Sequence, residues 1–505
     1  MSEQQRNGKR GGIYRDYYKI TGMWWADMYH RFDPLRESLR RYRVPFYIKR
    51  WFDRLLTDDY VKISYDAGKY QSHNSARRLK KLIYDYLIIF DFVSAFYYME
   101  EYIRRKYWNY KKFRRMKERL EVLLERIRKV LAQREDVIVF WTDCVSFCEL
   151  EWLPKLNERG KRSLFFERAY TPTPSTRPSM FAMANKWMNI DDFEKDKERS
   201  LDDRSSILLQ KVREYGYEAK YFSNSDRSCV FTQSIQHQNV RQYASSCRAC
   251  FDAINELMVS DKKQFLMIRA WVETHTPFLY PDNDGRRLLP IFNYTNIDFE
   301  KGTGAEYRQM RAAAEYWDKQ LDFYSDLFGD RSAKIYMSDH GKEYPQYGYR
   351  NWVDRTHHIF LFLQSKYAGG RREERIFSLE NFADLIEAVM RAHQSRQEID
   401  LDKVFERPYV RIQRVDTYNK DWINRLKTMH CEEGGHAYRG VRTAEDYYVR
   451  FRNRERYYRN GDEETDLIDD PGYAERIAEL RGLAGDYFID IYKNDKFKYS
   501  RELYQ

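Results

Sequence analysis

The amino-acid sequence predicts an α/β fold with a doubly wound, mostly parallel sheet, a helical N-terminal extension and a small C-terminal α+β subdomain. Three patterns indicate this fold. Apolar residues recur at helical spacing up to residue 134, short apolar runs alternate with helical stretches over residues 135–400, and strand-like patterns reappear beyond residue 400. At 505 residues, the chain is long enough for two or three domains.

The composition is that of a globular protein. Hydrophobic residues make up 42% and charged residues 33%, which separates the chain from disordered sequences. Tyrosine is abundant, with 43 residues. We interpret these tyrosines chiefly as core residues that replace Phe and Leu; the alternative is a surface that binds sugars, bases or partners.

Residues 1–134 are predicted to form a basic, mostly helical accessory domain. Residues 1–135 contain 32 Lys and Arg against 17 Asp and Glu, whereas the whole chain has a net charge of +11, so the basic character belongs to this region. Such a surface suits an anionic partner, either a membrane face, a nucleic acid or a polyanionic glycan. The alternative is a solvated helical face without a partner.

We expect a cytoplasmic protein, with any membrane contact peripheral and at the inner face. The first twelve residues are polar, and no apolar segment of a secretory signal follows them. The most apolar window, residues 82–98, contains Asp85 and Asp91 and is too short to span a bilayer.

The six cysteines are expected to be free thiols, as is usual in a long cytoplasmic chain. Cys144 and Cys148 form one close pair, and Cys247 and Cys250 form another. Together they could make a four-cysteine zinc site, although the wide separation between the pairs argues against it.

Residues 135–400 are predicted to be the central α/β domain. A buried parallel strand is expected at 137–141, because the run is short, continuous and apolar. Further strands are expected at 218–222, 265–271, 333–337 and 359–363, and helices at 180–187, 208–215, 247–258, 307–328 and 379–392. Residues 401–505 are predicted to form the C-terminal subdomain, with strands at 410–415 and 447–452 and a terminal helix over 474–487.

Acidic residues and a histidine follow two of the predicted strands. Asp143 comes after the first strand, and Asp339 and His340 come after the strand at 333–337. The carboxyl ends of parallel strands meet at one edge of the sheet, so these side chains can converge there. Carboxylate oxygens and imidazole nitrogens are common ligands of divalent cations. Gly341 would allow a sharp turn beside them.

A hydroxyl-rich, proline-stiffened turn, residues 170–179, leads into the helix predicted at 180–187. A hydroxyl at a helix N-terminus lies among free N–H donors, which is a setting for anions. A hydroxyl bound to a divalent metal is also acidic enough to act as a nucleophile. Taken alone, the segment is better explained as an ordinary capping turn.

The order of several short motifs resembles the sulfatase family of the alkaline phosphatase superfamily, over roughly residues 137–490. The matching segments are Val137–Asp143, Trp152–Leu156, Phe165–Tyr170, Thr176-Arg177-Pro178-Ser179, Tyr215–Tyr221, His275-Thr276-Pro277-Phe278, Tyr316-Trp317-Asp318, Ser338-Asp339-His340-Gly341, Gly440–Arg442, Tyr447–Val449 and Glu464–Pro471. The resemblance implies the alkaline-phosphatase/sulfatase type of fold, a catalytic domain at 135–400 and an anionic ester substrate.

The resemblance also implies roles for particular residues. A divalent metal ion, with Mn, Zn, Ca and Mg all open, would be held by Asp143, Thr176, Asp339 and His340. Thr176 would be the nucleophile, and His275 would contact a non-bridging oxygen or protonate the leaving group. Arg177, His357 and His358 are the candidates for substrate binding, with a surface position as the alternative for the two histidines.

The chain departs from the family pattern at several positions. Sulfatases convert a Cys or Ser to formylglycine, and Thr176 cannot supply that aldehyde. Met180 stands where the family has Arg, residues 223–225 lack the usual Lys and His, and Cys144 follows Asp143 in place of a second Asp. We therefore predict a sulfatase-like, metal-dependent hydrolase or transferase of phosphate esters, with sulfate esters as a second option. The alternatives are a true sulfatase or phosphomonoesterase, and a catalytically degenerate binding protein.

Overall fold

The computed structural model describes residues 12–23, 59–186, 206–223, 245–275, 278–281, 299–342, 352–414, 437–451 and 454–485. Its centre is a seven-stranded sheet with the order β4-β5-β1-β6-β8-β2-β9. The strands are β1 (Val137–Thr142), β2 (Leu164–Phe166), β4 (Glu218–Ser223), β5 (Gln264–Ala270), β6 (Ala333–Met337), β8 (Leu361–Gln364) and β9 (Arg372–Glu373). β4, β5, β1 and β6 are parallel, and β8 is antiparallel to both of its neighbours.

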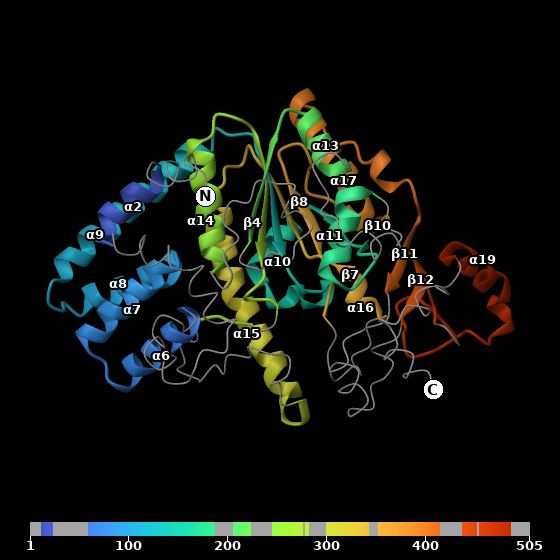
Figure 1. Ribbon diagram of the computed structural model, residues 1–505, viewed down its shortest axis with the longest axis horizontal. Helices are drawn as coiled ribbons and strands as arrows, with labels where there is room; N and C mark the ends of the chain where they lie inside the picture. The colour runs from blue at the N-terminus through green and yellow to red at the C-terminus, as the bar shows by residue number, and fades with distance from the viewer. Residues whose placement is uncertain are drawn as a thin grey trace, which may run out of the picture.

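Both faces of the sheet are covered, as the apolar runs predict. Ile138 and Phe140 of β1 point into one hydrophobic cluster, and Val137, Val139 and Trp141 point into the other. On the first face lie α14 (Ser246–Val259) and α15 (Phe299–Ser325), and on the second lie α11 (Thr176–Asn185), α13 (Ile207–Glu214) and α17 (Phe382–Ser395) (Figure 1). The predicted doubly wound α/β fold is confirmed.

The elements differ from the predictions mainly at their ends. The strand predicted at 359–363 is interrupted at Phe360 and divides into β7 (His358–Ile359) and β8, which join different sheets. The helix predicted at 307–328 is α15, which begins eight residues earlier. Asp318 in α15 accepts hydrogen bonds from the backbone N–H groups of Lys155 and Leu156, at 3.0 and 2.9 Å, and so caps α10 (Pro154–Lys161).

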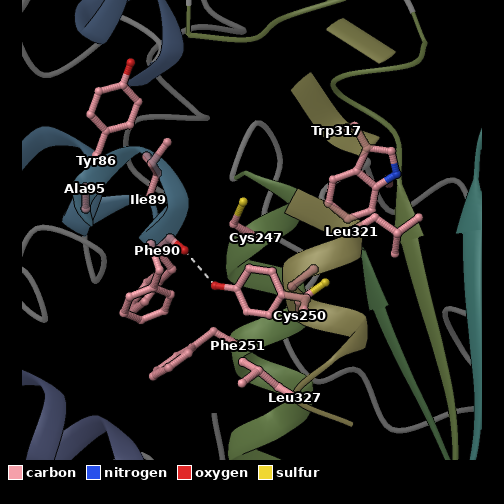
Figure 2. Close-up of a cluster of buried hydrophobic side chains, with 14 of the residues drawn as sticks. Tyr86, Ile89, Phe90, Ala95, Cys247, Cys250, Phe251, Trp317, Leu321 and Leu327 are labelled. Atoms are coloured by element: carbon pink, nitrogen blue, oxygen red, sulfur yellow. Dashed lines mark hydrogen bonds between the residues drawn. The ribbon is translucent and has the colours of Figure 1, made fainter. Parts of the chain in front are cut away.

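The N-terminal region is helical, as predicted, but its core is not separate. Its described helices are α2 (Ile13–Thr21), α6 (Asp59–Ser72), α7 (Ala76–Ile88), α8 (Phe92–Arg104) and α9 (Tyr110–Leu131), which lie beyond α14 and α15 (Figure 1). One continuous cluster joins them to the sheet. Figure 2 shows Phe90 against Phe251 of α14, and the two rings stack with centroids 4.7 Å apart. Tyr324 of α15 donates a hydrogen bond to the Phe90 carbonyl at 2.6 Å.

Two smaller sheets lie on the other side. The C-terminal subdomain contains the antiparallel strands β11 (Tyr409–Arg414), β12 (Tyr438–Thr443), β13 (Asp446–Arg450) and β14 (Glu455–Arg459), with α19 (Ala474–Ala484) packed on them. The strands β10 (Phe377–Ser378), β3 (Ala169–Tyr170) and β7 form a three-stranded sheet, and β3 is followed directly by the segment that leads to Thr176. No helix in the described part of the chain is long and apolar enough to cross a membrane.

Candidate active site

The site lies where β1 and β6 end. Trp141 of β1 pairs with Met337 of β6, so the residues after these strands meet at the same edge of the sheet. Asp143 and Asp339 are both fully buried there. Asp339 Oδ1 accepts hydrogen bonds from the backbone N–H groups of Cys144, at 3.2 Å, and His340, at 3.0 Å. The carboxylate thus ties the two strand ends together, as the sequence predicts.

Asp143 is paired with a cation from the neighbouring strand. Arg269 of β5 is buried, donates from Nε to Asp143 Oδ2 at 2.7 Å and makes a second contact through its terminal nitrogen. Burial raises the pKa of the Asp143 carboxyl, but the charges of Arg269, His275 and His340 outweigh burial and hold that pKa below its ordinary value. Asp143 is therefore ionised, and its Oδ1 is buried without a hydrogen-bond partner among the described residues.

Asp339 also has one oxygen without a partner. Its Oδ2 is buried, has no hydrogen bond within the described ranges, and lies 3.6 Å from His340 Nε2. Burial, and then the negative charge of Asp143, raise the pKa of Asp339. Two adjacent buried carboxylates, each with an unsatisfied oxygen, are costly unless a cation neutralises them.

His340 connects the carboxylates to the nucleophile candidate. Its Nδ1 lies 2.6 Å from the Gly341 carbonyl oxygen, which can only accept, so Nδ1 carries a proton and Nε2 is the ring nitrogen left to face the site. Thr176 Oγ1 lies 3.1 Å from this Nε2. Gly341 is required here because a Cβ atom would meet the Arg355 carbonyl oxygen at 2.1 Å.

Thr176 begins helix α11. The turn before it is held by buried hydroxyls: Thr171 Oγ1 and Ser179 Oγ lie 2.9 Å apart, and both donate to the Thr173 carbonyl oxygen. The helix starts with the hydrogen bond from the Ser179 N–H to the Ser175 carbonyl oxygen, at 3.0 Å. Thr176 therefore lies among N–H groups of the first turn, half-buried and facing His340.

Cys144 lies inside this group. It is buried, and a ligand atom from each of Asp143, Cys144 and His340 falls within 4.8 Å of the others. Burial, and then the charges of Asp143 and Asp339, raise the pKa of the Cys144 thiol, while the charge of Lys342 opposes this shift. Carboxylate oxygens, an imidazole lone pair and a thiol form a donor set that suits a divalent cation, and the two unsatisfied oxygens point to the same conclusion.

His275 follows β5 in a turn. Its ring stacks on Trp271 with centroids 5.0 Å apart, and its backbone N–H donates to the Trp271 carbonyl oxygen at 2.8 Å. Its charge reaches Asp143, whose pKa it helps to lower. Thr276 and Pro277 of the same motif lie outside the described residues.

The structure does not bring the other three predicted residues into this group. His357 Nδ1 contacts the Thr171 carbonyl oxygen at 2.8 Å, and its Nε2 contacts the Tyr438 hydroxyl at 2.6 Å. His358 contacts the Glu167 carbonyl oxygen at 2.9 Å, and its ring stacks on Phe147. Arg177 is exposed. Both histidines thus hold the loop before Thr176 in place, and a substrate contact by any of the three stays a prediction.

Three further residues belong to the site. Arg269 was missed, although a charged residue within an apolar strand signals a buried ion pair. Cys144 was considered as part of a four-cysteine zinc site and as a departure from the family pattern, but not as a neighbour of Asp143 and His340. Lys342 follows the metal motif, lies near Cys144 and places Nζ 4.2 Å from the centre of the Phe278 ring. No sequence signal distinguished it from an ordinary surface lysine.

The four described cysteines of the two close pairs are free, as predicted. Cys247 and Cys250 lie in the core on α14 (Figure 2), whereas Cys148 is exposed beside Arg355. Among the described residues, the group that could hold a metal contains Cys144 but none of the other three, so a four-cysteine zinc site is not formed.

Comparisons with known proteins agree with this fold. No protein-family model matches the chain, and no curated protein matches it in sequence. Among solved structures, a 2-O GAG sulfatase is 15% identical, with 73% of this chain and 94% of its own length covered and a TM-score of 0.50. A candidate sulfatase from Bacteroides thetaiotaomicron VPI-5482 is 14% identical, with the same coverage and TM-score. The chain therefore has the fold of the sulfatases in the alkaline phosphatase superfamily, as its motifs predicted.

Proposed function

We propose that this protein is a sulfatase-like, metal-dependent hydrolase or transferase that cleaves phosphate esters through Thr176. The observation that carries the proposal is the position of Thr176 Oγ1, 3.1 Å from His340 Nε2 and beside two buried carboxylates with unsatisfied oxygens. A nucleophile, an imidazole nitrogen and two carboxylate oxygens without hydrogen-bond partners among the described residues meet in one place. This arrangement is typical of a catalytic metal site rather than of a core.

The residues that would hold the cation are Asp143 through Oδ1, Asp339 through Oδ2, His340 through Nε2 and the Thr176 hydroxyl. When bound, a divalent ion would lower the pKa of that hydroxyl and offset the negative charge of the ester. The hydrogen bond from His340 Nδ1 to the Gly341 carbonyl oxygen orients the ring so that Nε2 faces the site and is the nitrogen available to the ion.

Thr176 acts as the nucleophile. Its hydroxyl proton is released to solvent, Oγ1 forms a bond to phosphorus, and the bond from phosphorus to the ester oxygen breaks. The N–H groups of the first turn of α11 face the negative phosphoryl oxygens. Water or an alcohol then attacks the phosphothreonine, the phosphorus–Oγ1 bond breaks, and Thr176 regains a proton.

His275 supplies the proton to the leaving ester oxygen or contacts a non-bridging oxygen. Its turn lies close enough to Asp143 for its charge to lower the pKa of that carboxyl. Arg177, His357 and His358 are second candidates for contacts with the rest of the substrate. Solvent-exposed Arg177 is the best placed of these, since both nitrogens of His357 are already engaged.

A phosphate ester is favoured over a sulfate ester because Thr176 cannot become formylglycine. The similar structure described as a 2-O GAG sulfatase acts, by its name, on sulfated glycosaminoglycan. An anionic ester is common to both options. Sulfate-ester cleavage is the second candidate function.

The basic N-terminal helices are a further part of the proposal. We infer contact with a polyanion or the inner membrane face, consistent with a cytoplasmic protein. Helix α9 exposes Lys111, Lys112, Arg115 and Arg119. Removing the region would break the shared core, so substitution of these four by Gln is the appropriate test. Binding to anionic vesicles that is unchanged in this variant would contradict the contact.

The function is tested with paired aryl substrates: a phosphodiester, a phosphomonoester and a sulfate ester, each with Mn²⁺, Zn²⁺, Mg²⁺ or Ca²⁺. Phosphodiester turnover that requires metal and falls at least about a thousandfold in Thr176→Ala supports the proposal. Ser175→Ala is the matched control, because Ser175 is exposed and makes no capping hydrogen bond through its side chain. Sulfate-ester turnover alone would favour the second candidate. Absence of both turnover and metal binding would indicate a degenerate binding protein.

A further inference from the structure

We propose that the Cys144 thiolate is an additional ligand of the metal and makes the site selective for zinc over magnesium and calcium. This inference rests on the proposed metal-dependent function and deepens it by naming the ligand and the ion. The ligand set differs from the sulfatase-family motif, because this sequence has Cys144 where an all-oxygen site would have a second Asp.

The position of the thiol is the first argument. Cys144 Sγ lies 3.7 Å from His340 Nε2 and 3.8 Å from Nδ1, and it shares the 4.8 Å group with Asp143 and His340. Nε2 is also the atom that faces Thr176. An ion held by His340 Nε2 would therefore have the sulfur within reach.

The backbone supports this position. Cys144 has φ of 60°, in the left-handed region that residues with a side chain rarely adopt. Its N–H donates to Asp339 Oδ1 at 3.2 Å, which fixes this conformation. A cysteine that serves only as a small apolar core residue has no need of such a conformation, and its neighbours here are two carboxylates and an imidazole.

Arg269 limits the number of oxygen atoms that Asp143 can offer to a metal ion. It occupies Oδ2 of Asp143, so this carboxylate presents a single oxygen, and the buried guanidinium stands beside the site as a fixed positive charge. The remaining donors are one oxygen from each Asp, one nitrogen and one sulfur, with the Thr176 hydroxyl as a further ligand. A mixed O, N and S set of this size matches zinc, whereas magnesium and calcium prefer oxygen ligands alone.

The test uses metal ions alone and does not depend on turnover. The metal-free protein is titrated with Co²⁺, and the near-ultraviolet region is followed for the charge-transfer band that a thiolate gives on cobalt. Zn²⁺, Mg²⁺ and Ca²⁺ affinities are measured by calorimetry. The variants are Cys144→Ser and, as the matched control, Cys148→Ser, whose exposed thiol lies outside the group.

We expect the band in the wild type and in Cys148→Ser, and its loss in Cys144→Ser. Zn²⁺ affinity should fall at least about tenfold in Cys144→Ser while Mg²⁺ affinity changes less than about threefold. Cys144→Asp is the second variant, because Asp tolerates the left-handed region better, and it should shift the preference from Zn²⁺ toward Mn²⁺ and Ca²⁺. Circular dichroism confirms that each variant is folded.

The outcomes separate this inference from the proposed function. Metal binding that is equally tight and equally selective in Cys144→Ser, without a charge-transfer band, overturns the thiolate ligand and leaves the Thr176 mechanism standing. A wild-type protein that binds none of these ions overturns both. The band in the wild type without metal-dependent turnover supports the ligand and overturns the proposed function.

Discussion

Two buried acidic clusters, one beside the N-terminal helices (Glu273 and Asp91) and one at the ends of β1 and β6 (Asp143 and Asp339), differ in one respect. In the first cluster, Glu273 of the turn after β5 accepts hydrogen bonds from the Tyr60 hydroxyl at 2.5 Å, the Ser246 N–H at 3.0 Å and the Ser246 hydroxyl at 2.5 Å. Asp91 accepts from the Ser94 N–H at 2.8 Å and the Tyr316 hydroxyl at 2.9 Å. In the strand-end cluster, Asp143 and Asp339 each keep one buried oxygen without a partner among the described residues.

The difference is what we expect if the first cluster holds the fold together and the second is the proposed metal site. Burial raises the pKa of Glu273 and Asp91, and the hydrogen bonds that they accept oppose this shift without cancelling it. Glu273 joins α6 and α14 to the turn that carries His275, and Asp91 joins α8 to α15. The strand-end carboxylates have too few donors for their oxygens. A site that binds a cation has to leave ligand atoms unsatisfied in the protein alone, and it does so at a cost in stability. Asp339 and Glu273 should therefore respond oppositely to loss of their charge, whereas Asp143 differs from both because it is paired with Arg269.

The largest effect is expected for Asp143→Ala. This substitution leaves Arg269 buried without its carboxylate and should lower the free energy of unfolding by about 3–5 kcal/mol, measured by urea denaturation without metal. The double variant Asp143→Ala with Arg269→Met should recover most of the loss. If Asp143→Ala is as stable as the wild type, the ion pair with Arg269 contributes nothing to stability. Charge would then not explain how the two acidic clusters differ.

The next largest loss of stability is expected in the cluster that contains Glu273. Glu273→Gln keeps the shape but turns an amide N–H₂ toward donors, so the free energy of unfolding should fall by about 2–3 kcal/mol while metal affinity stays unchanged. Glu315→Gln is the matched control, because Glu315 is exposed and its pair with Arg311 should contribute less than about 0.5 kcal/mol. A loss of metal binding in Glu273→Gln would show that the two clusters are not independent.

His357, a buried histidine whose two ring nitrogens both make hydrogen bonds, should give a pH-dependent effect on stability. Burial lowers the pKa of His357 to about 4, below the ordinary value of about 6.5 in the unfolded chain. Folding therefore favours the neutral form of His357. Its contribution to the free energy of unfolding is complete above pH ~6.5 and is lost as the pH falls toward ~4. From pH 7 to pH 5 the loss should be about 2 kcal/mol. His357→Gln should flatten this part of the stability curve, whereas His73→Gln, an exposed control, should leave it unchanged.

The smallest change in the stability of the metal-free protein is expected for Asp339→Asn, and this substitution should stabilise rather than destabilise. Removing a charge that burial and Asp143 both disfavour should leave stability unchanged or raise it by up to about 1 kcal/mol in chelator. Metal affinity should meanwhile fall about a hundredfold or more. A loss of 2 kcal/mol or more in chelator would show that Asp339 is satisfied in the same way as Glu273.

The sequence predicted the parts of the fold and site that depend on local pattern. Apolar runs located β1, β5 and β6, and because parallel strands end at one edge, the pattern alone brings Asp143, Asp339 and His340 together. The motif order added Thr176, and its closeness to His340 is what the structure contributes to that prediction. The predicted metal binding and the catalytic roles remain to be measured.

The sequence could not predict interactions that depend on tertiary packing. The pairing of Arg269 with Asp143 joins a residue of β5 to the residue that follows the adjacent β1, 126 positions away in the sequence. His357 and His358 were expected to be either substrate-binding or surface residues, and their hydrogen bonds to the loop before Thr176 and to Tyr438 depend on the neighbouring β3 and C-terminal sheet. The separation of residues 1–134 as a domain followed composition, whereas the hydrophobic core runs across residue 134 without interruption.

The most direct test of the central claim is metal content after equilibrium dialysis against Zn²⁺, compared among the wild type, Asp339→Asn and Glu273→Gln. Unsatisfied carboxylates that form a metal site predict about one ion per chain in the wild type and in Glu273→Gln, and almost none in Asp339→Asn. Equal zinc content in all three proteins, or none in the wild type, would contradict the assignment of the strand-end cluster as a metal site.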